Sequence, residues 1–157
     1  MSNFIPQEQW FKSIPKKFIA SSTLLFNFQG KMLILRTTYK EGWWLPGGVC
    51  EEGESPSAAA IRETAEEVGV QLKKVKFLGI EFKPTVGYKL NCLQFMFYGG
   101  RIHERDIKLQ SKEIAEYKFV SPTYAVKLMS KNISERTRYA LQSLKTGKTF
   151  YYESTGT

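Results

Sequence analysis

Histidine occurs once and cysteine twice in this 157-residue sequence. Cys50 and Cys92 lie far apart and show no spacing typical of a metal site. No apolar run approaches the roughly 20 residues that a membrane-spanning helix needs. The first ten residues lack the basic and then apolar pattern of a signal peptide. These absences argue against a zinc module and a membrane protein, and they predict a cytoplasmic protein with reduced thiols.

Negative charge is also scarce, because the sequence has 23 lysines and arginines but only 15 aspartates and glutamates, which gives a net charge of +8. The lysines are spread along the chain rather than gathered in one block. A basic surface attracts polyanions, and nucleotides and RNA are both polyanions, so charge alone does not choose between them. An ordinary basic surface without a ligand remains an open alternative.

The hydrophobic content of 42% and the aromatic content of 14% are those of a globular protein. We expect one domain over residues 1–157, with an N-terminal arm at 1–17 and a C-terminal tail at 146–157. Apolar patterns predict strands at 18–28, 31–36, 75–84, 89–98 and 117–121. Helices are predicted at 6–17, 122–129 and 134–145, the last with Ser134 as its cap. Turns are expected at 27–30 and 85–87, and a charged, mobile loop at 99–112. This order predicts an α/β layered domain.

A further helix is predicted within residues 48–70 (GVCEEGESPSAAAIRETAEEVGV), the stretch on which the functional reading depends. Ser55 is a good N-cap, Pro56 a good first helical residue and Gly69 the expected end. At about 100° per residue, one stripe of this helix is apolar and predicts a core face. That stripe consists of Ala58, Ile61, Ala65 and Val68. A different arc carries Arg62, Glu63, Glu66 and Glu67.

The three carboxylates of this arc crowd the C-terminal end of the helix, where the helix dipole is already negative. Their i,i+3 and i,i+4 spacings also set them against one another. Each effect costs about 0.3–1 kcal/mol, and Arg62 can compensate one carboxylate rather than three. A bound divalent cation would remove the conflict. Oxygen ligands without cysteine or histidine indicate Mg²⁺ or Mn²⁺ rather than zinc.

This stretch resembles the Nudix box, the signature of the Nudix hydrolase family. Gly48 is followed after five residues by Glu54, and after seven more by the run RETAEEVGV at 62–70. Every charged and glycine position of the family pattern is present. The one departure is Thr64, where the family usually has a bulky aliphatic residue, and we expect Thr64 on the buried side of the helix. Residues 43–48 (WWLPGG) also resemble the usual run into the box.

The resemblance implies a Nudix-type α/β/α sandwich, with a mixed β-sheet between helical layers and the box at one side of the sheet. It also implies a metal site for Mg²⁺ or Mn²⁺. The positions that match metal ligands are Gly47 (through its carbonyl), Glu63, Glu66 and Glu67. Arg62 matches a residue that orients the carboxylates by a salt bridge, and Glu54 matches a further acid near the metals.

A hydrolytic water also needs a group that accepts its proton. Glu67 can do this, although metal ligation would lower its basicity. The family often takes another acid from a loop outside the box, and such an acid can arrive when substrate closes the loop. Glu113, just before the last predicted strand, is our first choice and Glu116 our second. A plain surface acid at either position remains an open alternative.

The resemblance therefore implies a Mg²⁺-dependent pyrophosphohydrolase that cleaves a nucleoside diphosphate linked to another group X by attack of water on phosphorus. The identity of X is left open, so the substrate can be of the nucleoside triphosphate, ADP-ribose or NDP-sugar type. Two alternatives remain: a Nudix-like domain that senses a nucleotide or metabolite without turnover, and an RNA 5′-end pyrophosphohydrolase, for which the sequence has no RNA-specific sign. The expected partner is a nucleotide or nucleotide derivative, with no membrane partner, and a homodimer is left open.

Overall fold

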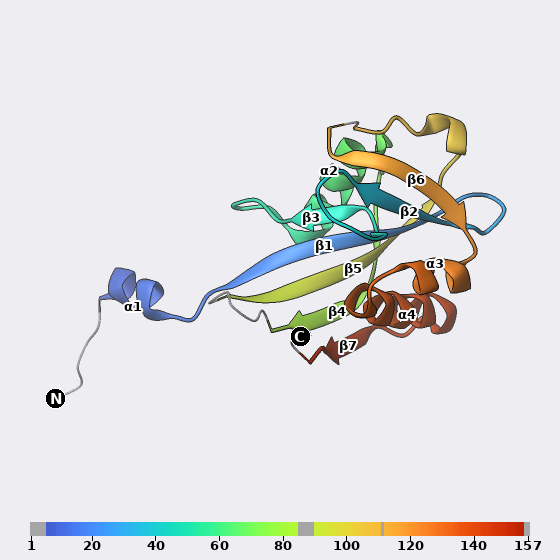
Figure 1. Cartoon of the computed structure of the whole chain (residues 1–157). Coiled ribbons are helices and arrows are strands. Elements are labelled where there is room, and N and C mark those ends of the chain that lie inside the picture. Colours follow the sequence, from blue (N-terminus) through green and yellow to red (C-terminus); the bar gives the residue numbers. More distant parts are fainter. Residues whose placement is uncertain (1–5, 85–89, 111, 156–157) are drawn as a thin grey trace.

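The computed structural model describes residues 6–84, 90–110 and 112–155 (Figure 1). The first part of the chain forms α1 (Gln7–Ser13), β1 (Lys17–Phe26), β2 (Met32–Thr37), β3 (Gly47–Val49) and α2 (Pro56–Val68). The second part forms β4 (Lys76–Lys83), β5 (Asn91–Arg101), the short 3₁₀ helix η1 (Glu104–Asp106), β6 (Ile114–Val120), α3 (Pro122–Leu128), α4 (Lys131–Thr146) and β7 (Phe150–Glu153).

Within the described residues the strands form one seven-stranded mixed sheet in the order β6-β2-β1-β5-β4-β7, with β3 paired to β1 beside β2. The pairs β1–β5 and β4–β7 are parallel, and the other pairs are antiparallel. The predicted hairpin at 18–36 is confirmed, because Phe26 lies opposite Met32 across the turn. Beyond that pair β2 diverges from β1, and β3 fills the space with Gly48 opposite Ser21.

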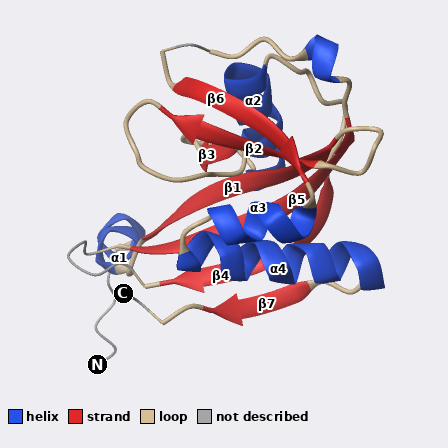
Figure 2. Ribbon diagram, turned by 45° about the vertical axis from the view of Figure 1, so that its right-hand side comes forward, coloured by secondary structure: helices blue, strands red, loops and turns tan. Residues whose placement is uncertain are grey.

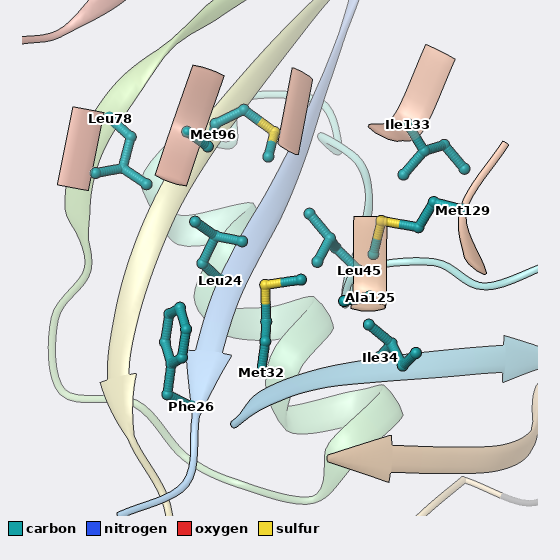
Figure 3. Packing of buried hydrophobic residues seen from close by; sticks show 11 residues of the cluster. Leu24, Phe26, Met32, Ile34, Leu45, Leu78, Met96, Ala125, Met129 and Ile133 are labelled. Atoms are coloured by element: carbon teal, nitrogen blue, oxygen red, sulfur yellow. The ribbon is translucent and has the colours of Figure 1, made fainter. Parts of the chain in front are cut away.

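Helices cover both faces of the sheet, with α3 and α4 on one side and α2 on the other (Figure 2). Successive residues of a strand point to opposite faces, so neighbouring residues of β1 enter different halves of the core. Leu24 and Phe26 pack with Ile133 and other residues of the α3–α4 layer (Figure 3). Leu25 instead packs in the layer that contains Val68 of α2. The predicted α/β sandwich with a mixed sheet between helical layers is confirmed.

The C-terminal part of the chain differs from the prediction in two respects. Helix α4 begins at Lys131 after Ser130, so the expected cap at Ser134 is wrong. Ser134 is buried inside the helix, where its hydroxyl donates to the carbonyl of Lys131 over 2.8 Å. The tail, to which the sequence analysis gave no structure, contains β7, which pairs in parallel with the edge strand β4.

Two further expectations concern loops. The turn expected at 85–87 lies outside the described residues. The segment expected as a mobile loop at 99–112 begins as the end of β5 and continues through η1. It is then attached to the end of α2, because Lys108 N–H donates to the carbonyl of Val68 and Gln110 N–H to that of Glu67.

The predicted N-terminal helix is present as α1, which extends away from the body of the molecule (Figure 1). None of its residues is buried. Trp10 and Phe11 contact each other edge to face at 5.0 Å and remain about half exposed. Across the described ranges, no helix is both long and apolar enough to cross a membrane.

Candidate metal and substrate site

Helix α2 begins and ends where its sequence predicts. The Ser55 hydroxyl accepts the backbone N–H of Ala58, and Pro56 occupies the first turn. Gly69 ends the helix in the left-handed region, with φ at 76°. The helix therefore presents the three glutamates of its last turns beside β3 and the loop that follows it.

The buried face of α2 is rotated from the predicted apolar stripe. Ala58 is exposed. The buried residues of the helix are Ala59, Ala60, Thr64, Glu67 and Val68. The small alanines allow the helix to approach β1 closely, and the hydrogen bond of Glu67 to β3 turns that carboxylate toward the sheet. Thr64 is fully buried as predicted. Its hydroxyl donates to the carbonyl of Ala60 over 2.7 Å, which satisfies the polar group that replaces an aliphatic side chain.

Arg62 connects the other three acids of the box. Its Nε and Nη2 donate to the two oxygens of Glu54 at 2.9 and 3.0 Å, a bidentate pair. Its Nη1 donates to Glu63 at 2.9 Å and to Glu66 at 3.0 Å. The planar guanidinium thus hydrogen-bonds to three carboxylates, two of them from the crowded helix end, although its single positive charge balances only one negative charge. The hydrogen bond from Arg62 holds the pKa of Glu54 below its usual range.

Glu67 is the one acid of the helix end that Arg62 does not hold. Its side chain faces the sheet, and its Oε2 accepts the backbone N–H of Gly47 over 2.8 Å. Burial raises the pKa of Glu67 to about 7, and the charges of Glu63, Glu113 and Glu66 add to the shift. Burial also raises the pKa of Glu63, against the opposing effect of Arg62. Burial is thus the main cause of both shifts, and the mutual repulsion inferred from spacing adds to it.

Two glycines allow β3 to lie between α2 and β1. A Cβ at Gly47 would come within 2.0 Å of the carbonyl oxygen of Ser21, and its φ of 147° disfavours any side chain. A Cβ at Gly48 would come within 2.4 Å of Glu63 Oε1. Glycine is therefore required at 47, where the near atoms are backbone, whereas at 48 a side chain would displace the carboxylate of Glu63.

The chemical type of these donors suits a hard divalent cation. Carboxylate oxygens crowded at one helix end, two of them with raised pKa, are the ligands that Mg²⁺ and Mn²⁺ prefer. In their present rotamers, however, Glu63 and Glu66 are directed to Arg62 and Glu67 to Gly47. Among the described residues, no three acidic, histidine or cysteine side chains converge as a preformed metal site.

The structure separates the two candidates for the base. The charge of Glu113 contributes to the raised pKa of both Glu63 and Glu67, so Glu113 lies within electrostatic reach of the helix end. Its backbone is fixed by Thr38, whose N–H donates to the Glu113 carbonyl over 2.8 Å. Glu116 instead forms ion pairs on the sheet with Arg36 at 3.0 Å and Lys118 at 3.2 Å. The first choice of the sequence analysis is therefore near the cluster, and the second is engaged elsewhere.

Beside this acidic cluster lies a cavity of about 170 Å³. Glu67 lines it on the side of α2, next to Gly47 and Gly48 of β3. Its lining also includes Tyr39, Lys40, Trp44, Gln94 and Arg136. The cavity thus extends from Glu67 at the end of α2 to Arg136 of α4.

The sequence analysis missed Gln94 and Arg136, and with them Glu81, which forms an ion pair with Arg136 over 3.1 Å. A signal for Arg136 was available. It lies three residues after Ile133 and four before Ala140, on the stripe of α4 that is otherwise buried and uncharged. A charged residue on such a stripe indicates a buried partner. Glu81 likewise stands in a strand pattern between the apolar Ile80 and Phe82.

Comparison with known proteins agrees with this geometry. The family model described as NUDIX domain matches residues 16–143. An uncharacterised Nudix hydrolase of Pseudomonas aeruginosa is 30% identical over 109 residues, which cover 66% of this chain and 62% of the relative. An RNA pyrophosphohydrolase of Gluconobacter oxydans is 45% identical over 53 residues, covering 32% of this chain and 31% of the relative. The chain thus spans less than two thirds of these curated relatives.

Solved structures share the fold. A MutT protein from Methanosarcina mazei is 24% identical with a TM-score of 0.68, covering 87% of this chain and 100% of that one. A MutT protein from Bacillus halodurans is 21% identical with a TM-score of 0.71, covering 88% of this chain and 90% of that one.

Proposed function

Because the chain belongs to the NUDIX domain family, we propose that it is a Mg²⁺- or Mn²⁺-dependent hydrolase of the phosphoanhydride bond in a nucleoside diphosphate linked to another group X. The observation that carries this proposal is the position of Glu67. This one carboxylate belongs to the crowded end of α2 and also lines the cavity beside it. A diphosphate placed there has its charge next to the oxygen donors and its organic part in the cavity.

The residues have distinct roles in this proposal. Glu63, Glu66 and Glu67, with the Gly47 carbonyl, would hold the cation, which when bound neutralises the diphosphate and lowers the pKa of water. Arg62 positions Glu63 and Glu66 by direct hydrogen bonds. It also fixes Glu54 in the loop between β3 and α2, where Glu54 accepts the backbone N–H of Glu51.

Glu113 is proposed as the group that takes the proton from the attacking water. It comes from a different element than the box, and its backbone is fixed by Thr38. A carboxylate that does not bind the cation keeps its basicity, which is the physical reason to place the base outside α2. Water attack then gives two phosphate-bearing products, one of which retains the nucleoside.

A second candidate is hydrolysis of the 5′-end of RNA. The net charge of +8 favours a polyanionic substrate, and one relative, matched over 53 residues, is an RNA pyrophosphohydrolase. The match covers only 31% of that relative, so RNA hydrolysis is the second candidate rather than the first. A domain that binds a nucleotide without turnover is the third candidate.

A substrate panel tests these candidates directly. Nucleoside triphosphates, ADP-ribose, NDP-sugars, dinucleoside polyphosphates and a 5′-triphosphorylated RNA are incubated with Mg²⁺ or Mn²⁺, and the products are identified by mass spectrometry. The proposal expects cleavage of a small nucleotide substrate that stops with chelator and returns with added metal. Full activity in chelator, cleavage of RNA alone, or binding without any turnover would each overturn it.

A further inference from the structure

The side of the cavity formed by α4 contains a buried ion pair that is only partly satisfied. Arg136 Nη1 donates to Glu81 Oε2 over 3.1 Å, and the side chains are 8% and 0% exposed. Within the described part of the chain, Arg136 Nε and Glu81 Oε1 are buried without a hydrogen-bond partner. Burying two charges is costly, and hydrophobic residues of the same volume often serve stability as well. A buried arginine that keeps unused donors and lines a cavity therefore indicates a role toward a ligand.

The sheet register places a second polar group beside this pair. Glu81 lies opposite Gln94 across β4 and β5, and Gln94 lies opposite Ala20 across β5 and β1. Residues opposite one another in register share a face of the sheet, and here it is the face that Arg136 reaches from α4. Gln94 and Arg136 both line the cavity.

The two groups offer complementary chemistry. A guanidinium has only donors, so Arg136 requires an acceptor on the ligand. The amide nitrogen of Gln94 is already used, because Nε2 donates to Ser22 Oγ over 3.2 Å and to the carbonyl of Phe95 over 3.4 Å. Since Gln94 lines the cavity, we assign its Oε1 as the acceptor for a ligand there. A ligand edge with an oxo group next to a ring N–H satisfies both.

The charge balance favours a neutral group over a second phosphate. Two cationic side chains, Arg136 and Lys40, line the cavity, and the carboxylates of Glu81 and Glu67 balance their charges, so no uncompensated positive charge remains for a second phosphate. Tyr39 and Trp44 line the same space and supply aromatic surface suited to a planar ring. The cavity therefore fits a nucleobase, with the diphosphate left at the carboxylates.

We propose that this cavity holds the base of the substrate nucleoside and that Arg136 and Gln94 select bases with an adjacent oxo group and ring N–H, guanine and uracil, over adenine and cytosine. Adenine and cytosine present an amino group where these bases carry the oxo group, so a donor would face the donors of Arg136. Glu81 acts as a positioning residue that fixes the guanidinium. The inference rests on the proposed function and adds the identity of its nucleoside.

The wild-type protein provides the first test. The nucleoside monophosphates GMP, UMP, AMP and CMP are titrated into metal-free protein, and tryptophan fluorescence is recorded because Trp44 lines the cavity. We expect GMP or UMP to bind at least about tenfold more tightly than AMP and CMP. Equal affinities, or tighter binding of AMP, would overturn the base assignment without touching the proposed hydrolysis. Absence of hydrolysis in the substrate panel would overturn the proposed function without deciding this titration.

Variants provide the second test, with GDP-, UDP-, ADP- and CDP-glucose as substrates that differ only in the base. Arg136→Lys keeps the charge but loses the planar fork, and it should reduce the ratio of kcat/KM for oxo over amino bases by about tenfold. Glu81→Gln should reduce the same ratio, mainly through KM. Arg138→Lys, an exposed position on the same helix, is the matched control and should leave the ratio unchanged.

Gln94→Met keeps the length of the side chain and removes its acceptor, so it tests the site even if changes in the ion pair prevent folding. It should weaken the binding of GMP or UMP in the fluorescence titration and leave the binding of AMP unchanged. The proposal would be overturned if both Arg136→Lys and Gln94→Met kept the wild-type preference for oxo bases over amino bases.

Discussion

The backbone N–H of Gly47 donates to Glu67 Oε2 over 2.8 Å and so joins β3 to the last turn of α2. Through this bond the sheet fixes the one carboxylate that Arg62 does not reach. The acids at the end of α2 are thus held from two directions, by a side chain of the helix itself and by the backbone of a strand.

Gly47→Ala should destabilise the protein by more than about 2 kcal/mol, since its Cβ would overlap backbone atoms of β1 that cannot move aside. Gly53→Ala is the matched control. Gly53 also has positive φ, at 74°, but a Cβ there would meet nothing within 4 Å, so its cost should stay near 1 kcal/mol. Urea unfolding of both variants measures the difference. Equal losses would show that backbone conformation, rather than the close approach to Ser21, requires glycine at 47.

Glu67→Gln should keep or raise the melting temperature of metal-free protein, because the amide retains an acceptor for Gly47 and removes a buried charge among like charges. Turnover should fall by about 10²-fold or more. Glu52→Gln, an exposed change in the preceding loop, should alter neither quantity. The two readouts are calorimetry in chelator and initial rates with Mg²⁺. Near-normal turnover in Glu67→Gln would remove Glu67 from the proposed site.

Arg62→Met should lower the free energy of unfolding by about 1–2 kcal/mol, because Glu54, Glu63 and Glu66 then repel one another without a shared cation. Arg36→Met removes a more exposed ion pair with Glu116 and should cost less than about 1 kcal/mol. Chemical unfolding of both variants in chelator measures the contrast. If the two costs are equal, the network around Arg62 is no stronger than an ordinary surface pair.

Glu113→Gln should lower kcat far more than it raises KM, since the proposed role is proton transfer rather than binding. Glu116→Gln is the control, because its carboxylate is engaged by Arg36 and Lys118 on the sheet. Steady-state kinetics on the substrate found in the panel give both constants. Wild-type behaviour of Glu113→Gln together with impaired Glu116→Gln would move the role to Glu116. If both variants behave as wild type, the base lies in the box.

Local chemistry made the box helix predictable. Ser55, Pro56 and Gly69 each act through their own backbone preferences, so the helix begins and ends as expected. Strands β1, β2, β4, β5 and β6 were also predicted, because their apolar patterns are set by burial on two faces, whereas the short strands β3 and β7 were not. The orientation of α2 was not predictable in the same way, because Glu67 is turned inward by a bond to β3 that sequence spacing does not show.

The cavity depended on contacts between distant parts of the chain. Glu81 and Arg136 are brought together by the packing of α4 on β4, and neither residue has a local partner that reveals the other. The cap at Ser134 failed for a similar reason, since the burial of α4 against the sheet extends the helix back to Lys131. These features are set by tertiary packing rather than by propensity.

The parallel pairing of β1 with β5 has a consequence for how the chain folds. Lys17 lies opposite Asn91 and Phe26 opposite Arg101, so the two central strands come from remote parts of the sequence. Such long-range parallel pairs form slowly, because loop closure must precede the contacts that reward it. The strand that will occupy the middle of the sheet is therefore synthesised early but waits for its neighbour until β5 has left the ribosome. During that interval the turn between β1 and β2 supplies the local contact at the end of β1, and the edge that β5 later covers stays open to chaperones or to other chains.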